Sequence, residues 1–252
     1  MHSFFADSSC IKGNTVTIGG SDYNHIKNVL RLKAGEEVSV ITGEADREYR
    51  CAVEGYDETA KTVKLSLLFV KEDNIELPCR IYLFQGLPKG DKLEFIIQKS
   101  VELGAYQIIP VATKRSVVKL DEKKLSKRNE RYNAISEAAA KQSKRRIIPE
   151  VMPVMSFSDA ISYCREQEID IRLFPYELCD TSSMERTREI FGSIKPQKSV
   201  AVFIGPEGGF SAEEAELAEK EGFFPVTLGK RILRTETAGL AVLSWLVYLL
   251  EE

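Results

Sequence analysis

The chain has 252 residues, 43% of them hydrophobic, and a formal net charge of −3. This length accommodates one large domain or two smaller ones, and the hydrophobic fraction is ordinary for a globular protein. The five cysteines are scattered without a C-x-x-C pair and two histidines occur, which argues against a disulfide framework and a zinc site. We therefore expect no metal and a reduced, cytoplasmic location, and the first residues lack the basic start and apolar core of a signal peptide.

The first 70 residues are predicted to form short strands with one helix. Strand-like runs cover residues 14–18, 36–42, 48–53 and 62–70. Ser21 is expected to cap a short helix that continues to Leu30. Several short strands with glycines at their turns are typical of a small β-barrel.

A polar segment, residues 71–78, is predicted to link this part to a second domain, which gives domains 1–72 and 73–252. Beyond the linker the pattern alternates between strands and helices. Strands are expected at residues 80–84, 107–111, 171–174, 200–204 and 224–228, and helices at residues 89–103, 129–142, 156–167 and 183–191. This alternation indicates an α/β domain with a mostly parallel sheet.

Positive charge is concentrated between Lys114 and Arg146, where twelve Lys or Arg face four Asp or Glu. That segment carries +8, so the rest of the chain carries −11 to reach the total of −3. A protein that is acidic on average can still present a basic face to nucleic acid. The segment therefore predicts contact with an RNA.

A glycine turn follows a buried strand near the C-terminus. The apolar run 200–204 leads directly into Gly205-Pro206-Glu207-Gly208-Gly209. Glycines allow positive φ and close approach of the backbone to a ligand, and proline fixes φ. Ser211 lies three residues before Glu214, which predicts a capping box and a helix that ends at Gly222.

A second glycine turn, residues 229–234, follows the next predicted strand. The carboxyl ends of strands in open α/β sheets are common ligand sites. Neither G-x-x-x-x-G-K-[ST] nor G-x-G-x-x-G occurs, and Glu207 would repel a phosphate, so an uncharged or cationic ligand fits better. The alternative is an ordinary strand–turn–helix corner.

The chain closes with an apolar helix predicted at residues 237–250. This helix is shorter than the ~18 residues that a membrane span needs, so we expect no membrane association. A helix that is apolar on every side must be buried. We therefore expect it to lie in a core or in the interface of a homodimer.

The two turns also resemble a known family. GPEGGFS at residues 205–211, followed by LGKRILRTETA at residues 228–238, is similar to the C-terminal signature of the RsmE family. Further similarities lie at residues 24–31, 87–104, 131–143 and 174–177. Members of this family are S-adenosylmethionine-dependent methyltransferases that modify uridine N3 in 16S ribosomal RNA. The resemblance implies an N-terminal PUA-like RNA-binding β-barrel, a C-terminal SPOUT α/β domain with a trefoil knot, and a homodimer acting on 16S rRNA within the small ribosomal subunit.

The turns and the resemblance together assign functional residues. Residues expected to bind S-adenosylmethionine are Phe174, Glu177, Ile204, Gly205, Pro206, Glu207, Gly208, Gly209, Leu228, Gly229, Arg231, Ile232, Leu233, Thr237 and Ala238. Residues expected to contact RNA are Arg31, Lys89, Lys99, Gln142, Ser143, Arg145 and Arg146. Arg234 is the expected stabiliser of the uracil anion, and Glu236 is a candidate general base, although a carboxyl with a pKa of ~4.3 is a weak base.

Two other functions remain open at this stage. The first is an RNA-binding protein without catalytic activity, and the glycine turns argue against it because such a protein needs no cofactor pocket. The second is an enzyme that acts on a small nucleotide. The basic segment and the additional N-terminal barrel argue against that second function.

Overall fold

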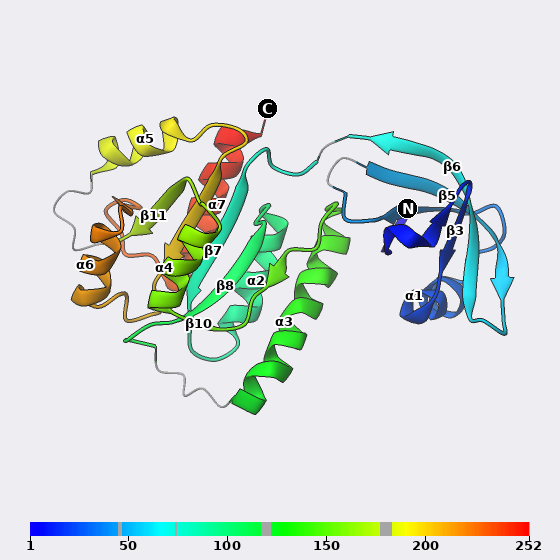
Figure 1. The fold of residues 1–252 in the computed structure, drawn as a ribbon, viewed down its shortest axis with the longest axis horizontal. Coiled ribbons are helices and arrows are strands. Elements are labelled where there is room, and N and C mark those ends of the chain that lie inside the picture. The colour runs from blue at the N-terminus through cyan, green and yellow to red at the C-terminus, as the bar shows by residue number, and fades with distance from the viewer. Residues whose placement is uncertain (45–46, 74, 117–121, 177–182, 252) are drawn as a thin grey trace. The chain divides into compact units, whose positions relative to one another are not determined.

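The computed structural model describes residues 1–44, 47–73, 75–116, 122–176 and 183–251. The chain forms two compact units (Figure 1), residues 1–76 with residues 140–148, and residues 77–139 with residues 149–252. The contacts divide the chain at residue 76, whereas the predicted division falls after residue 72. Residues 140–148, which the prediction assigned to the second domain, belong to the first unit because two of their arginines are buried against its carboxylates.

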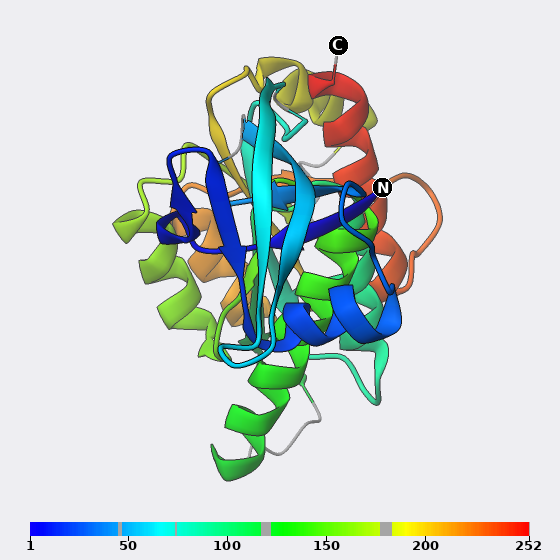
Figure 2. The same ribbon diagram turned by 90° about the vertical axis from the view of Figure 1, so that its right-hand side faces the viewer.

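The first unit is built on a six-stranded sheet, blue to cyan in Figure 2. Its strands are β1 (His2–Phe5), β2 (Ile11–Lys12), β3 (Thr15–Ile18), β4 (Glu37–Ile41), β5 (Arg47–Asp57) and β6 (Thr62–Glu72), in the order β1-β4-β5-β6-β3-β2. β1 runs parallel to β4, and the other pairs are antiparallel. Buried side chains alternate along the strands, as in Val16 and Ile18 or Val63 and Leu65, so one face of the sheet forms the core of this unit.

The predicted strands of this unit are present, but its helical segment begins differently. Gly19 is the N-cap of α1 (Gly20–Asn24), which continues directly into the π-helical turn η2 (His25–Val29). The prediction that Ser21 caps this helix was therefore wrong. Gly20, the first residue of α1, has a φ of +65°, so the chain turns sharply where the helix begins. A short 3₁₀ turn, η1 (Ser8–Cys10), also precedes β2.

The second unit contains the predicted parallel sheet. Its strands are β7 (Arg80–Gly86), β8 (Gln107–Ala112), β9 (Glu150–Val151), β10 (Met155–Ser156), β11 (Ile171–Pro175), β12 (Ser199–Ile204) and β13 (Phe224–Val226). They pair in the order β10-β8-β7-β12-β11-β13, with β9 beside β8, and every pair is parallel. The central strands are mostly apolar and buried because helices cover both faces.

Alternate residues of β12 point into two different cores. Val200, Val202 and Ile204 pack with side chains from α2 (Lys92–Glu102), α5 (Met184–Ser193) and α7 (Thr235–Leu250). Ala201 and Phe203 pack with side chains from α4 (Phe157–Glu166) and α6 (Ala212–Lys220). A further helix, α3 (Glu122–Gln142), ends within the first unit. The helices described here include none that is both long and apolar enough to cross a membrane.

The helix ends that border the glycine turns follow capping chemistry. Ser211 and Glu214 form both hydrogen bonds of the predicted capping box, and Gly222, with a φ of +77°, follows the end of α6 as expected. α7 begins at Thr235, two residues before its predicted start, because Arg234 takes the extended conformation of an N-cap. Arg234 and Glu236 therefore flank the first residue of this helix.

Candidate functional site

A pocket of about 530 Å³ lies within the second unit, at the carboxyl ends of β11, β12 and β13. Three segments form most of its wall: residues 204–210, residues 226–235 and the residues that end β11. Both predicted glycine turns therefore border one cavity. Such a cavity at the carboxyl edge of a parallel sheet is where open α/β folds bind ligands.

Most residues assigned to the cofactor line this pocket. They are Ile204, Gly205, Pro206, Glu207, Gly208, Gly209, Leu228, Gly229, Arg231, Ile232, Leu233 and Ala238, joined by Arg234. Phe174 instead lies in the core, where its ring stacks on Phe210 with a centroid distance of 4.5 Å, and Phe210 is the one that lines the pocket. Thr237 is exposed on α7, and Glu177 lies outside the described residues.

The first turn closes because two glycines approach each other. A Cβ atom on Gly205 would lie 3.1 Å from the Cα of Gly209, tighter than ordinary contact. Gly209 has a φ of +65°, and its N–H donates to the carbonyl of Pro206 at 2.9 Å. Side chains at these positions would open the turn or strain it. The turn therefore leaves backbone groups at the pocket wall.

The start of α7 is fastened to this turn by Thr235. Its hydroxyl donates to the carbonyl of Gly205 at 2.6 Å and accepts from the amide of Gln85 at 2.8 Å. Gln85 and Thr235 are both buried, so this chain of hydrogen bonds is shielded from water. It holds the carboxyl ends of β7 and β12 and the first turn of α7 together.

Glu207 does not have a free carboxylate. Its Oε1 lies 2.8 Å from the ammonium of Lys92, and the backbone N–H of Lys89 donates to both of its oxygens at 3.2 and 3.3 Å. Burial alone would raise the pKa of Glu207, but the hydrogen bonds from Lys92 and from backbone N–H groups outweigh it and lower the pKa. The positive charge that Glu207 balances is thus that of Lys92.

Eight residues that line the pocket are absent from the predicted site residues, among them Lys92, Arg115 and Thr235. Arg115 donates from Nη1 to the carbonyl of Gly208 at 2.8 Å, so it supports the first turn. Lys92 and Thr235 lie within residues 87–104 and 228–238, which resemble the family. That resemblance is the sequence feature that could have identified them. Arg115 follows β8 in a loop with no glycine or other motif, and nothing in its local sequence indicates this contact.

The comparisons with known proteins match both units of the chain. A model of the RNA methyltransferase domain matches residues 75–247, and a model of the RNA methyltransferase PUA domain matches residues 18–66. Over 237 residues the chain is 38% identical to ribosomal RNA small subunit methyltransferase E of Bacillus subtilis, an alignment that covers 93% of this chain and 90% of that protein. The chain belongs to the ribosomal RNA small subunit methyltransferase E family.

Solved structures support this membership at the level of the whole fold. A methyltransferase E from Neisseria gonorrhoeae, bound to S-adenosyl methionine, is 30% identical with a TM-score of 0.81, over 99% of this chain and 98% of that one. A methyltransferase from Legionella pneumophila, in complex with the same cofactor, is 32% identical with a TM-score of 0.80, over 98% of this chain and 96% of that one. The methyltransferase E fold therefore extends over both units.

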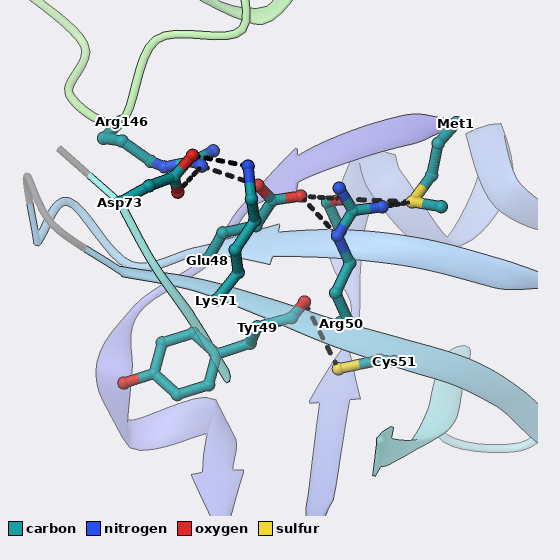
Figure 3. A network of polar contacts seen from close by, with 9 residues as sticks. Met1, Glu48, Tyr49, Arg50, Cys51, Lys71, Asp73 and Arg146 are labelled. Atoms are coloured by element: carbon teal, nitrogen blue, oxygen red, sulfur yellow. Dashed lines mark hydrogen bonds and ion pairs between the residues drawn. The ribbon is translucent and has the colours of Figure 1, made fainter. Parts of the chain in front are cut away.

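Two residues expected to contact RNA are buried in this methyltransferase E chain. Arg146 is 4% exposed, and its Nη2 lies 2.6 Å from Glu48 and 2.8 Å from Asp73 (Figure 3). Arg145 is 6% exposed and donates from Nε to Glu76 at 3.0 Å. Both guanidinium groups neutralise carboxylates of the first unit. This burial stands against the prediction that they contact RNA, because a buried arginine with buried carboxylate partners presents no charge to a phosphate.

The other residues expected to contact RNA have accessible side chains. Arg31, Lys89 and Gln142 are exposed, and Arg31 has a left-handed backbone with a φ of +54°. Lys99 is half-buried and pairs with Glu102 at 2.8 Å, and Ser143 is half-buried after the end of α3. The five residues are divided between the two units of the methyltransferase E fold.

Proposed function

We propose that this protein transfers the methyl group of S-adenosylmethionine to N3 of a uridine in the 16S ribosomal RNA of the small ribosomal subunit. The observation that carries the proposal is the pocket bordered by both glycine turns, in a chain of the methyltransferase E family. The names of the relatives supply the ribosomal RNA substrate, and the solved relatives supply the cofactor. The choice of uridine N3 rests on the resemblance of residues 205–211 and 228–238.

The pocket fits a cofactor with a flat apolar base and a sugar. Ile232 lines the pocket and is 81% exposed, so its apolar surface is available to cover an adenine face. Ile204 and Leu228 line the pocket as well. Backbone groups of Gly205, Gly208, Gly209, Leu228 and Leu233 are placed to recognise the polar edges of the nucleoside. The bound cofactor supplies a methyl group that its positive sulfonium activates for transfer.

Two residues at the start of α7 are proposed to act on the uracil. Methylation at N3 requires that the N3 proton leaves and that negative charge on the pyrimidine is stabilised. Arg234 lines the pocket as the N-cap of α7 and supplies the positive charge. Glu236 is the candidate acceptor of the N3 proton, and its Oε2 lies 3.4 Å from the ammonium of Lys92. Its carboxylate is one residue beyond Thr235, which anchors the first turn of α7 to Gly205.

We extend the proposal to the finer fold. Residues 77–252 take the trefoil-knotted SPOUT fold, and the sheet of the first unit closes into a PUA-like barrel that binds RNA. The knot rests on the resemblance of residues 205–211 and 228–238 to the family. Support for the barrel comes from the PUA model at residues 18–66. Arg31, Lys89, Lys99, Gln142 and Ser143 stay as proposed RNA contacts, and an enzyme of ribosomal RNA acts in the cytoplasm.

The working form is proposed to be a homodimer. α7 exposes Tyr248 at 85% and Leu249 at 46%, and α2, which packs against α7, exposes Phe95 at 47%. Exposed apolar side chains on two helices that pack together are suited to contact with a second copy of the chain. Light scattering at micromolar concentration should give twice the mass of the chain, and a monomer mass would refute the dimer.

The test of the proposed function is a methylation assay on small ribosomal subunits that lack the modification. Subunits are incubated with the protein and S-adenosylmethionine that carries a labelled methyl group, and the nucleosides are analysed by mass spectrometry. Label in N3-methyluridine is the expected result. Label in a ribose 2′-O-methyl group or in an N1-methyl purine would overturn the proposed substrate atom. No label despite RNA binding would favour the RNA-binding protein without catalytic activity.

A further inference from the structure

Lys92 joins two segments that border the cofactor pocket. It is the first residue of α2 and itself lines the pocket. Its ammonium lies 2.8 Å from Oε1 of Glu207, in the first glycine turn, and 3.4 Å from Oε2 of Glu236, in the first turn of α7. One cation therefore contacts two carboxylates. In the sequence, Glu207 precedes the second glycine turn and Glu236 follows it.

The two contacts differ in length. The contact with Glu207 is a hydrogen-bonded ion pair at 2.8 Å, and it is the largest cause of the raised pKa of Lys92. The contact with Glu236 is a longer ion pair at 3.4 Å, and it raises the pKa of Lys92 as well. The side chains of Lys92, Glu207 and Glu236 are 33%, 31% and 20% exposed, so all three are partly shielded from water. Coulomb attraction is stronger there than at an open surface.

We propose that Lys92 is a positioning residue that sets the distance between the first glycine turn and the first turn of α7. This inference rests on the proposed function, because it concerns the same pocket. Lys92 holds Glu207, and with it the backbone groups of the Gly205–Gly209 turn, in the arrangement that the cofactor meets. It also compensates the charge of Glu236, whose Oε2 lies 3.4 Å from its ammonium.

The alternative is that Lys92 forms an ordinary surface ion pair. Exposed pairs of this kind contribute little, because solvent screens them and because two long side chains lose conformational freedom. Three features distinguish Lys92 from such a pair: it contacts two carboxylates, it lines the pocket, and one of its partners is also fixed by the backbone N–H of Lys89. The removal of Lys92 would leave two carboxylates at the pocket without their shared cation.

The experiment compares Lys92→Met, Lys92→Arg and a matched control, Lys198→Met. Lys198 forms a 2.8 Å ion pair with Asp170 before β11 and β12 begin, at the edge of the sheet opposite the pocket. For each variant, calorimetry gives the affinity for S-adenosylmethionine, and the subunit assay gives kcat and the KM for RNA. Circular dichroism establishes that each variant is folded.

Lys92→Met should bind S-adenosylmethionine roughly tenfold more weakly and have a roughly tenfold lower kcat. Such a loss lies within the range of interaction energies measured between contacting residues. Lys92→Arg should recover most of both losses, because a guanidinium still bridges two carboxylates. The KM for RNA should stay within about twofold, since the contact lies at the cofactor. Lys198→Met should match the wild type in all three quantities. A Lys92→Met protein that behaves like Lys198→Met would overturn the proposal.

A double-mutant cycle with Glu207→Gln separates positioning from general destabilisation. If Lys92 acts on the turn through Glu207, Lys92→Met should change cofactor affinity by less than about twofold in the Glu207→Gln background. An unreduced loss in that background would contradict the coupling. Absence of labelled methyl transfer by the wild type would instead remove the proposed function, and the cofactor affinities would still report on Lys92. The two failures are thus distinguishable.

Discussion

Arg146 and Glu48 form an ion pair in which both side chains are buried, 4% and 7% exposed, with 2.6 Å between Nη2 and Oε2 (Figure 3). The two residues are far apart in the sequence, yet both belong to the first unit. Ser39 also donates a hydrogen bond to Glu48, and Arg50 adds an ion pair at 2.8 Å. The segment 140–148 is therefore an integral part of the first unit.

The first prediction follows from this burial. Arg146→Met should destabilise the first unit by about 3–5 kcal/mol, because it leaves the carboxylate of Glu48 buried without its main cation. The free energy of unfolding, measured by urea denaturation and monitored on the first unit, checks this. Lys64→Met is the matched control, since Lys64 pairs with Glu54 at 2.8 Å on the exposed surface of the same unit, and it should cost less than about 1 kcal/mol. Equal losses for the two variants would contradict the prediction.

The sequence explains why Arg145 and Arg146 were predicted to contact RNA. Arg145 and Arg146 follow a helix in the most basic part of the chain, and charge density alone favours a nucleic-acid contact. Their partners lie elsewhere: Glu76 is separated from Arg146 by 70 positions, and no local pattern indicates that pairing. Burial of a charged residue is decided by long-range contacts that composition does not contain. The Lys92–Glu207 contact, separated by 115 positions, escaped prediction for the same reason.

Local chemistry, in contrast, was readable from the sequence. The apolar run 200–204 is a central strand buried on both faces, and Ser211 with Glu214 forms the capping box that their spacing indicates. The two glycine turns border one pocket because the carboxyl ends of neighbouring parallel strands meet at the same edge of the sheet. Periodicity could not separate Phe174 from the pocket residues, since its side chain points into the core on one face of β11.

The second prediction concerns the dependence of stability on pH. A hydrogen bond from Lys198 and another from the backbone N–H of Ser199 lower the pKa of Asp170 from 3.8 to about 2. Because the unfolded chain binds this proton more tightly than the folded one, Asp170 stabilises the fold above pH ~4 and loses that contribution as the pH falls from ~4 towards 2. The free energy of unfolding of Asp170→Asn should be lower than that of the wild type at pH 5.

The difference between the wild type and Asp170→Asn should narrow from pH 4 to pH 2, as measured by chemical denaturation at each pH. Lys198→Met serves as a second variant. It removes the largest cause of the lowered pKa of Asp170, so the loss of stability with falling pH should begin at a higher pH in this variant. A constant difference between the wild type and Asp170→Asn throughout this range would contradict the assignment.

The third prediction concerns close packing behind the first glycine turn. A Cβ atom on Gly86 would lie 2.6 Å from both the backbone nitrogen and the Cδ of Pro206. Gly86→Ala should therefore push the turn into the pocket, lowering stability by about 1–3 kcal/mol and weakening S-adenosylmethionine binding. Gly192→Ala is the control, because a Cβ there meets no atom within 4 Å and the residue lies in α5. It should leave cofactor binding unchanged, as calorimetry would show.

The fourth prediction concerns Arg234, which lines the pocket as the N-cap of α7 without a side-chain capping bond. Its charge is expected to stabilise the uracil anion, an interaction that strengthens in the transition state. Arg234→Ala should therefore lower kcat by roughly 10²–10³-fold, as the loss of one preorganised donor does, while the affinity for S-adenosylmethionine changes much less. Arg188→Ala, which removes an exposed arginine of α5, should have wild-type kcat. Full activity in Arg234→Ala would refute this role and leave the assignment of the cofactor pocket intact, because that assignment depends on the glycine turns and not on this guanidinium.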